Sequence, residues 1–212
     1  MDTFLEQLVV YDEDQKCIEA AGEGNIEALN VCMNKGFEPS RSGNKGWTGL
    51  RIAAKNGKYE TVKLLLNRSA HVDASNYTGH TALMMACTYG HEEVVKILLE
   101  KGADPNKVNA NGTTSLMLAV IAEDSEIVRI LLENGANPNI QNKQGKTALM
   151  YAVETRKKKV VELLLNNGAD AFITDDKGIF RGLNAIDCAK KSGFDEIVML
   201  FGNTDAIKKE GK

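Results

Sequence analysis

Residues 79–106 read GHTALMMACTYGHEEVVKILLEKGADPN, and the same pattern begins again at Gly112, at Gly145 and, in degraded form, at Gly46. These starting glycines are 33 residues apart. A unit of this length cannot bury its apolar face alone, so it has to pack against neighbouring units. The period therefore predicts a stacked solenoid, whose function lies on an extended surface and not in a catalytic cleft.

Within one unit the sequence predicts a turn followed by two helices. Gly79 supplies the left-handed backbone of a tight turn, and Thr81 is placed to cap a short helix of small and apolar residues. Gly90 ends that helix. A second helix starts near His91 with acidic residues in its first turn, presents a broad apolar face, and ends at Gly102.

This arrangement resembles the ankyrin repeat over nearly the whole chain. The resemblance implies an all-α solenoid, in which each repeat is a β-turn or hairpin plus two antiparallel helices, stacked into a curved elongated domain. The family usually has Thr-Pro-Leu-His at the first helix, where this chain has Thr-Ala-Leu-Met at 81–84 and 147–150, Thr-Ser-Leu-Met at 114–117 and Thr-Gly-Leu-Arg at 48–51. The family's histidine hydrogen-bonds adjacent turns together. Methionine offers no such polar anchor, so we expect less rigid turns.

We expect a single ankyrin-repeat domain over residues 14–202, flanked by an N-terminal extension (1–13) and a polar tail (203–212) that frays. The extension forms a short helix that shields the end of the stack, which we favour, or belongs to a binding site. An insertion at 179–182 carries Ile179 and Phe180, which either cover the C-terminal core or face a partner. The expected units are a cap at 14–42, repeats at 43–75, 76–108, 109–141 and 142–174, and a C-terminal unit at 175–202.

Composition argues against several classes of protein. The chain is 43% hydrophobic and 26% charged, with a formal net charge of -3, so nothing attracts it generally to nucleic acid or to an anionic membrane. No stretch approaches the roughly 20 apolar residues of a membrane span. The acidic N-terminus argues against a secretory signal.

The four cysteines are expected to be small core residues, because none forms a CxxC pair and no histidine lies at a ligand spacing from them. We therefore expect a reducing, cytoplasmic compartment, with secretion into a host cell left open. They are Cys17, Cys32, Cys87 and Cys188.

No catalytic constellation stands out. None of the three histidines, His71, His80 and His91, lies beside an obvious nucleophile, and the chain has neither a GxSxG motif nor a P-loop. The many glycines recur at turns and caps, where repeat geometry explains them better than phosphate binding does. We therefore expect no enzyme activity, no cofactor and no metal site.

The resemblance implies binding at the hairpin tips and the first-helix face, which line a concave groove in ankyrin proteins. Trp47, Tyr77 and Tyr89 are the expected anchors, because tryptophan and tyrosine are rigid and amphipathic. The alternative for Trp47 is that it folds onto the N-terminal cap. Lys55 and Asn56 lie on the same helix face. The candidate protein-binding residues are Trp47, Arg51, Tyr77, His80, Thr88, Tyr89, Thr113, Ile121, Lys146 and Glu154.

A second candidate site is the basic run Arg156, Lys157, Lys158 and Lys159 at the start of a second helix, where the other units carry glutamate at the position of Lys159. Cations there oppose the helix dipole. The run is either a solvated surface variation or a site for an acidic or phosphorylated segment. Arg156 and Glu123 also replace glycines that normally end first helices, so we expect strain in both turns.

Taken together, these features predict a monomeric, non-enzymatic protein that binds another protein on its concave face. A rigid, preorganised surface limits the entropy that is lost on binding. Besides a free-standing adaptor, two alternatives stay open. One is a regulatory inhibitor that occludes an enzyme or a transcription factor, and the other is a bacterial effector that acts on host proteins.

Overall fold

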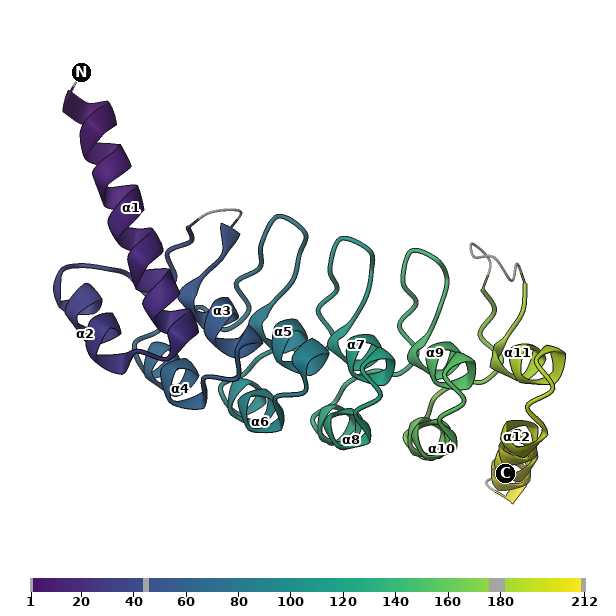
Figure 1. The fold of residues 1–212 in the computed structure, drawn as a ribbon. Helices are drawn as coiled ribbons and strands as arrows, with labels where there is room; N and C mark the ends of the chain where they lie inside the picture. The colour runs from purple at the N-terminus through teal and green to yellow at the C-terminus, as the bar shows by residue number, and fades with distance from the viewer. Residues whose placement is uncertain (1, 44–45, 176–181, 211–212) are drawn as a thin grey trace. The chain divides into compact units, whose positions relative to one another are not determined.

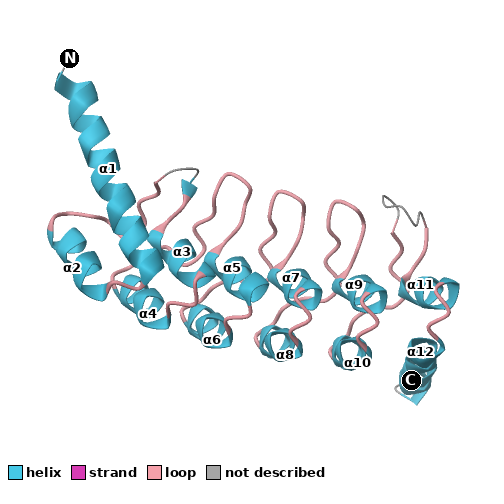
Figure 2. Cartoon of the chain, viewed as in Figure 1, coloured by secondary structure: helices cyan, strands magenta, loops and turns pink. Residues whose placement is uncertain are grey.

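The computed structural model describes residues 2–43, 46–175 and 182–210, with side chains described for 13–43, 46–175 and 182–202. These described residues form helices and loops without a regular strand (Figure 2). Two isolated antiparallel bridges, Ser42 with Thr48 and Val108 with Thr114, close the bases of two hairpin loops. The chain divides into two compact units, Met1–Asp104 and Pro105–Lys212, and each is described by itself.

In unit 1, consecutive helices pair as antiparallel hairpins (Figure 1). The first helices pack side by side, α1 on α3 and α3 on α5, while each second helix packs on the first helix of its own repeat. Helix α4 also contacts α6. The helices of this unit are α1 (Asp2–Glu23), α2 (Ile26–Asn34), α3 (Gly49–Lys55), α4 (Tyr59–Asn67), α5 (Ala82–Tyr89) and α6 (Glu92–Glu100).

Unit 2 repeats this arrangement. Helix α7 packs on α9 and α9 on α11, and each of these contacts the second helix that follows it in the chain. Helix α10 packs against both α8 and α12. The helices of this unit are α7 (Ser115–Ile121), α8 (Ser125–Glu133), α9 (Ala148–Glu154), α10 (Lys158–Asn166), α11 (Ala185–Lys191) and α12 (Asp195–Glu210). The helix pairs therefore follow the predicted 33-residue repeats.

The repeated threonine and leucine of the first helix explain why each helix starts and packs as it does. The hydroxyls of Thr48, Thr81, Thr114 and Thr147 each accept a hydrogen bond from the backbone N–H three residues later. The leucine two residues after each threonine is buried. Gly90 has φ +73° at the end of α5, as predicted.

The hairpin loops have a polar anchor that the sequence analysis missed. Asn76 Oδ1 accepts hydrogen bonds from the backbone N–H groups of Thr78 (3.1 Å) and His80 (2.9 Å). In unit 2, Asn109 and Asn142 make the same pair of bonds at the same loop position. In these three loops the asparagine thus holds the turn through its own side chain, whereas the methionine at the position of the family's histidine is a buried core residue.

Two of the four cysteines are bonded to each other. Cys17 of α1 and Cys32 of α2 form a disulfide, with their Cα atoms 5.8 Å apart. The prediction that all four cysteines are unbonded core residues is therefore wrong for this pair, because the α1–α2 hairpin brings together two positions 15 residues apart in sequence. Cys87 and Cys188 are buried and lie outside the disulfide. The expectation of a reducing compartment loses the support that it took from unbonded thiols.

The two described ends of the chain are helical, and two turns have the predicted strain. The extension and the first cap helix form one helix, α1, and α12 continues past Gly202 to Glu210, beyond the expected end of the last unit. Positive φ values at Glu123 (61°) and Arg156 (57°) confirm the predicted strain in those turns. The side chains of the extension and the tail, and Ile179 and Phe180 of the insertion, lie outside the described residues.

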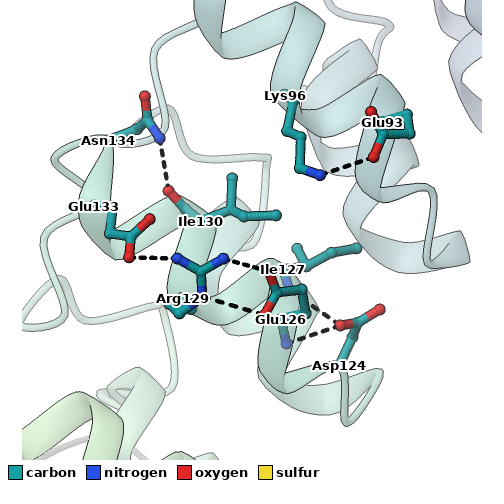
Figure 3. A network of polar contacts seen from close by, with 9 residues as sticks. All are labelled: Glu93, Lys96, Asp124, Glu126, Ile127, Arg129, Ile130, Glu133 and Asn134. Carbon is teal, nitrogen blue, oxygen red and sulfur yellow. Dashed lines mark hydrogen bonds and ion pairs between the residues drawn. The ribbon is translucent and has the colours of Figure 1, made fainter.

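Helix α8 carries a network of partly exposed polar contacts. On α8, Arg129 bonds to both Glu126 and Glu133, while the Asp124 carboxylate accepts from the backbone N–H groups of Glu126 and Ile127 (Figure 3). The two glutamates raise the pKa of Arg129 through hydrogen bonds and charge. Exposed pairs of this kind contribute little to stability, so the helix is held mainly by its buried face.

Candidate protein-binding surface

Side chains from two adjacent repeats of unit 1 meet around one lysine. Trp47 directly precedes the cap of α3, and Arg51 and Lys55 follow it at four-residue intervals, a spacing that places them on one side of the helix. The Lys55 ammonium lies 5.6 Å from the centre of the Trp47 ring and 5.5 Å from that of Tyr89, the last residue of α5. Both distances are in the range of cation–π contacts. We call Trp47, Lys55 and Tyr89 the aromatic–lysine cluster.

Backbone contacts fix the position of Lys55. The His91 ring donates a hydrogen bond through Nε2 to the Lys55 carbonyl at 2.8 Å, and the neighbouring Asn56 amide donates to the Gly22 carbonyl at 2.8 Å. The Lys55 side chain is half-buried, and among the described residues no carboxylate pairs with its ammonium. The backbone at Lys55 is therefore held by two contacts, and within the described part of the chain its ammonium lies near two ring faces and no carboxylate.

Arg51 lies beneath this cluster and is fully buried. Its guanidinium is 4.4 Å from the centre of the Trp47 ring, and its Nη1 donates to the Gly46 carbonyl at 2.6 Å, whereas Nε and Nη2 find no hydrogen-bond partner among the described residues. Burial lowers the pKa of Arg51 to about 10. The expectation that Arg51 contacts a partner is therefore corrected. It supports Trp47 and the turn, from the position that histidine occupies in the family motif.

The other candidates of unit 1 differ in exposure. Tyr77 is 85% and Tyr89 51% exposed, so both rings are accessible. Thr88 is exposed, and its hydroxyl donates to the Met84 carbonyl at 2.8 Å. His80 is half-buried, with Nδ1 2.9 Å from the Thr78 hydroxyl. Burial, and then the positive charge of Arg51, lower the pKa of His80, so the imidazole is neutral at pH 7.

The candidates of unit 2 form a mixed surface. Lys146 pairs with Glu154 at 2.7 Å and lies 5.2 Å from the centre of the Tyr151 ring. Ile121 is 46% exposed, while Thr113 is half-buried in its hairpin. The lysine and the glutamate neutralise each other. This unit therefore offers apolar and hydrogen-bonding contacts on its candidate face, without the uncompensated charge of the aromatic–lysine cluster.

The positive charges of the basic run have more nearby partners than the sequence indicates. The Arg156 guanidinium lies 4.3 Å from the centre of the Phe194 ring, and the Lys157 ammonium pairs with Glu123 at 2.6 Å. A cavity of about 440 Å³ beside Arg156 and Lys158 is lined by the acidic residues Asp195 and Glu196 as well. These contacts fit the interpretation of the run as a solvated surface variation better than they fit a binding site that carries positive charge alone.

Replacing Lys159 by glutamate is expected to stabilise unit 2 by a few tenths of a kcal/mol. Lys159 is exposed in the first turn of α10, where a negative charge interacts favourably with the helix dipole. Urea unfolding would measure the change, with Lys143→Glu as a control because this exposed lysine lies in a hairpin loop. A lower midpoint for Lys159→Glu than for the control would contradict the helix-dipole argument.

Comparison with known proteins identifies the family. The model of ankyrin repeats (3 copies) matches residues 17–109 and 101–175, so the chain belongs to the ankyrin-repeat family. Ankyrin repeats are generally protein–protein interaction modules, and the family is typically non-enzymatic. No curated protein matches the chain.

Two further findings concern metals and membranes. Where the structure describes side chains (residues 13–43, 46–175 and 182–202), histidine, cysteine and carboxylate groups do not gather into a group of three that could hold a metal ion. Over residues 2–43, 46–175 and 182–210, none of the helices has both the length and the apolar character that crossing a membrane needs.

The sequence places Lys55 on the first-helix face, but Lys55 is not among the candidate binding residues, although a signal for its role is present. Lys55 occupies the same repeat position as Thr88, Ile121 and Glu154, all three of which were chosen as candidates. Its importance depends on the ring of Tyr89 from the next repeat, which lies 34 residues later in the sequence. The repeat period could have paired the two positions, since Tyr89 directly follows the equivalent of Lys55.

Proposed function

We propose that this chain is a non-enzymatic, monomeric adaptor that binds a protein partner through the hairpin and first-helix face of unit 1. The observation that carries the proposal is the aromatic–lysine cluster, in which Lys55 is held between Trp47 and Tyr89. Tyr89 is exposed and Trp47 is half-buried, and aromatic side chains beside a preorganised cation are typical binding anchors. The membership of the ankyrin-repeat family supports a protein as the partner.

The local structure also supports a preorganised surface. Asn76 and Thr81 fix the hairpin before α5, and His91 fixes the end of α3 through the Lys55 carbonyl. Side chains already held in place lose less entropy when a partner binds. Tyr77, at the tip of the Asn76 hairpin, then offers an additional apolar contact.

The proposal predicts that replacing Tyr77 and Tyr89 together by alanine abolishes partner capture and leaves folding intact. Both rings are exposed, so we expect the free energy of unfolding to change by about 0.5 kcal/mol or less for each. Affinity capture from a native lysate, read by mass spectrometry, would compare this variant and Trp47→Ala with the wild type.

A matched control for that experiment is Phe172→Ala, which removes a 52% exposed ring from a loop of unit 2. Proteins retained by the control and lost by both site variants would support the proposal. A set of captured proteins that all the variants retain would place the binding site elsewhere. Unfolding of the tyrosine variant would show that these rings are structural.

A further inference from the structure

We infer that the segment bound by the aromatic–lysine cluster is an acidic peptide segment of a protein, with an Asp or Glu carboxylate on the Lys55 ammonium and an apolar side chain against Trp47 or Tyr89. This inference rests on the proposed function and specifies the chemistry of the partner. It starts from two cations of one short helix, Arg51 and Lys55, that have no carboxylate partner among the described residues.

The charge of this face has one sign. The hairpins and first helices of the two full repeats of unit 1, residues 42–57 and 76–90, contain Lys45, Arg51 and Lys55 and neither aspartate nor glutamate. The whole chain, by contrast, has 29 acidic and 26 basic residues. A local excess of positive charge on a chain of net charge -3 is therefore a feature of this face. It would attract an acidic segment and repel a basic one.

The buried position of Arg51 strengthens this attraction. A charge surrounded by protein is poorly screened by solvent, so its field acts at the surface above it. The Trp47 ring contacts both Arg51 and Lys55, so the buried cation and the accessible one share this ring. A carboxylate on Lys55 would interact with both charges, directly with the ammonium and at longer range with the guanidinium.

The equivalent positions of unit 2 show what a compensated site looks like. There Glu154 occupies the repeat position of Lys55 and pairs with Lys146 within the chain. In unit 1 the repeat position of Glu154 carries the cation, and the described residues of this unit provide no carboxylate for it. The partner is the source of the missing negative charge in our proposal.

A protein segment fits this face better than a nucleic acid does. A nucleic acid would be expected to need several phosphate contacts along a basic stripe, whereas the described cations of these two hairpins and first helices are Arg51, which is buried, and Lys55. One accessible ammonium between two rings matches one carboxylate with apolar neighbours. Binding of a nucleic acid is nevertheless an outcome that the experiment below can detect.

The test is selection of a random dodecapeptide library, displayed on phage, against the immobilised full-length chain. We expect the peptides selected by the wild type to be enriched in Asp and Glu relative to the unselected library, and this enrichment to disappear with Lys55→Glu. The matched control is Lys63→Glu, since Lys63 is an exposed lysine of α4 that also faces a ring, that of Tyr59 at 5.8 Å. The control should keep the acidic enrichment.

A selected peptide would then be titrated against the chain with the fluorescence of Trp47, the single tryptophan, as the readout. Replacing the peptide's Glu by Gln, or Lys55 by Gln, should each weaken binding at least tenfold, and the two changes together should weaken it little further. Circular dichroism would confirm that each variant is folded. Oligo-dT of twelve nucleotides tests the alternative, and we expect it to leave Trp47 fluorescence unchanged.

The outcomes separate this inference from the proposed function. Selection of neutral or basic peptides whose binding requires Trp47 and Tyr89 would contradict an acidic partner segment but would support the proposed binding face. Acidic peptides that bind Lys55→Glu equally well would overturn the assignment to Lys55. If oligo-dT binds more tightly than the selected peptides and this binding depends on Lys55, the partner would be a nucleic acid and not a protein. Selection of no peptide at all would count against both proposals.

Discussion

Reduction of the Cys17–Cys32 disulfide is expected to lower the free energy of unfolding of the N-terminal helices by about 3 kcal/mol, the value for a closed loop of roughly 15 residues. A cavity of about 470 Å³ lies beside the two cysteines. The Arg41–Asp14 ion pair at the same cavity, 3.1 Å long and partly exposed, adds little.

The loss should fall on the N-terminal end of unit 1. In a repeat protein each repeat is stabilised by its own packing and by contacts with the adjacent repeats, so a local change in stability acts mainly on the repeat where it occurs. We therefore expect α1 and α2 to unfold at lower urea concentration than the remaining helices when the disulfide is reduced. Hydrogen exchange of the backbone amides would show this as a loss of protection confined to these two helices.

The control is the double variant Cys17→Ala with Cys32→Ala, which should unfold like the reduced wild type and should not respond to the reductant. Thiol titration of the denatured, unreduced wild type should find two reactive groups, those of Cys87 and Cys188. An unfolding curve of the wild type that is the same with and without reductant would contradict the stabilising role of the disulfide.

The helical framework could be predicted from the sequence because its causes are local and repeated. The threonine caps, the glycine turns and the apolar spacing of each repeat act within about ten residues, and the repeats confirm one another. The strained turns at Glu123 and Arg156 were predicted for the same reason, since glycine is the usual residue at those positions. The Asn76, Asn109 and Asn142 anchors are also local, since each asparagine bonds to backbone N–H groups two and four residues later.

The contacts that were missed depend on distances between repeats. Cys17 meets Cys32 because two helices lie antiparallel, and Lys55 meets Tyr89 because two first helices pack side by side. Arg51 is a predicted contact of the concave face, yet the helix buries this position in every full repeat, where Met84, Met117 and Met150 are buried as well. The repeat pattern was therefore a better guide to burial than the chemistry of the side chain.

Replacing Arg51 by methionine is expected to raise the free energy of unfolding by about 1–2 kcal/mol. Two donors of the buried guanidinium have no partner among the described residues, and replacing unpaired buried polar groups by apolar ones of similar size is stabilising. Methionine is already the buried residue at this position in the next three repeats. The variant gives up the bond to the Gly46 carbonyl and the stack on Trp47, which partly offset the gain.

Urea unfolding of Arg51→Met can separate the removal of charge from the filling of space. Arg51→Ala also removes the charge but leaves a cavity, so it should be less stable than Arg51→Met by about 2 kcal/mol or more. Arg68→Met makes the same chemical change at an exposed arginine and should be nearly neutral. If Arg51→Met is instead less stable than the wild type, the Gly46 bond and the Trp47 stack outweigh the unpaired donors, and Arg51 stabilises the turn that carries Trp47.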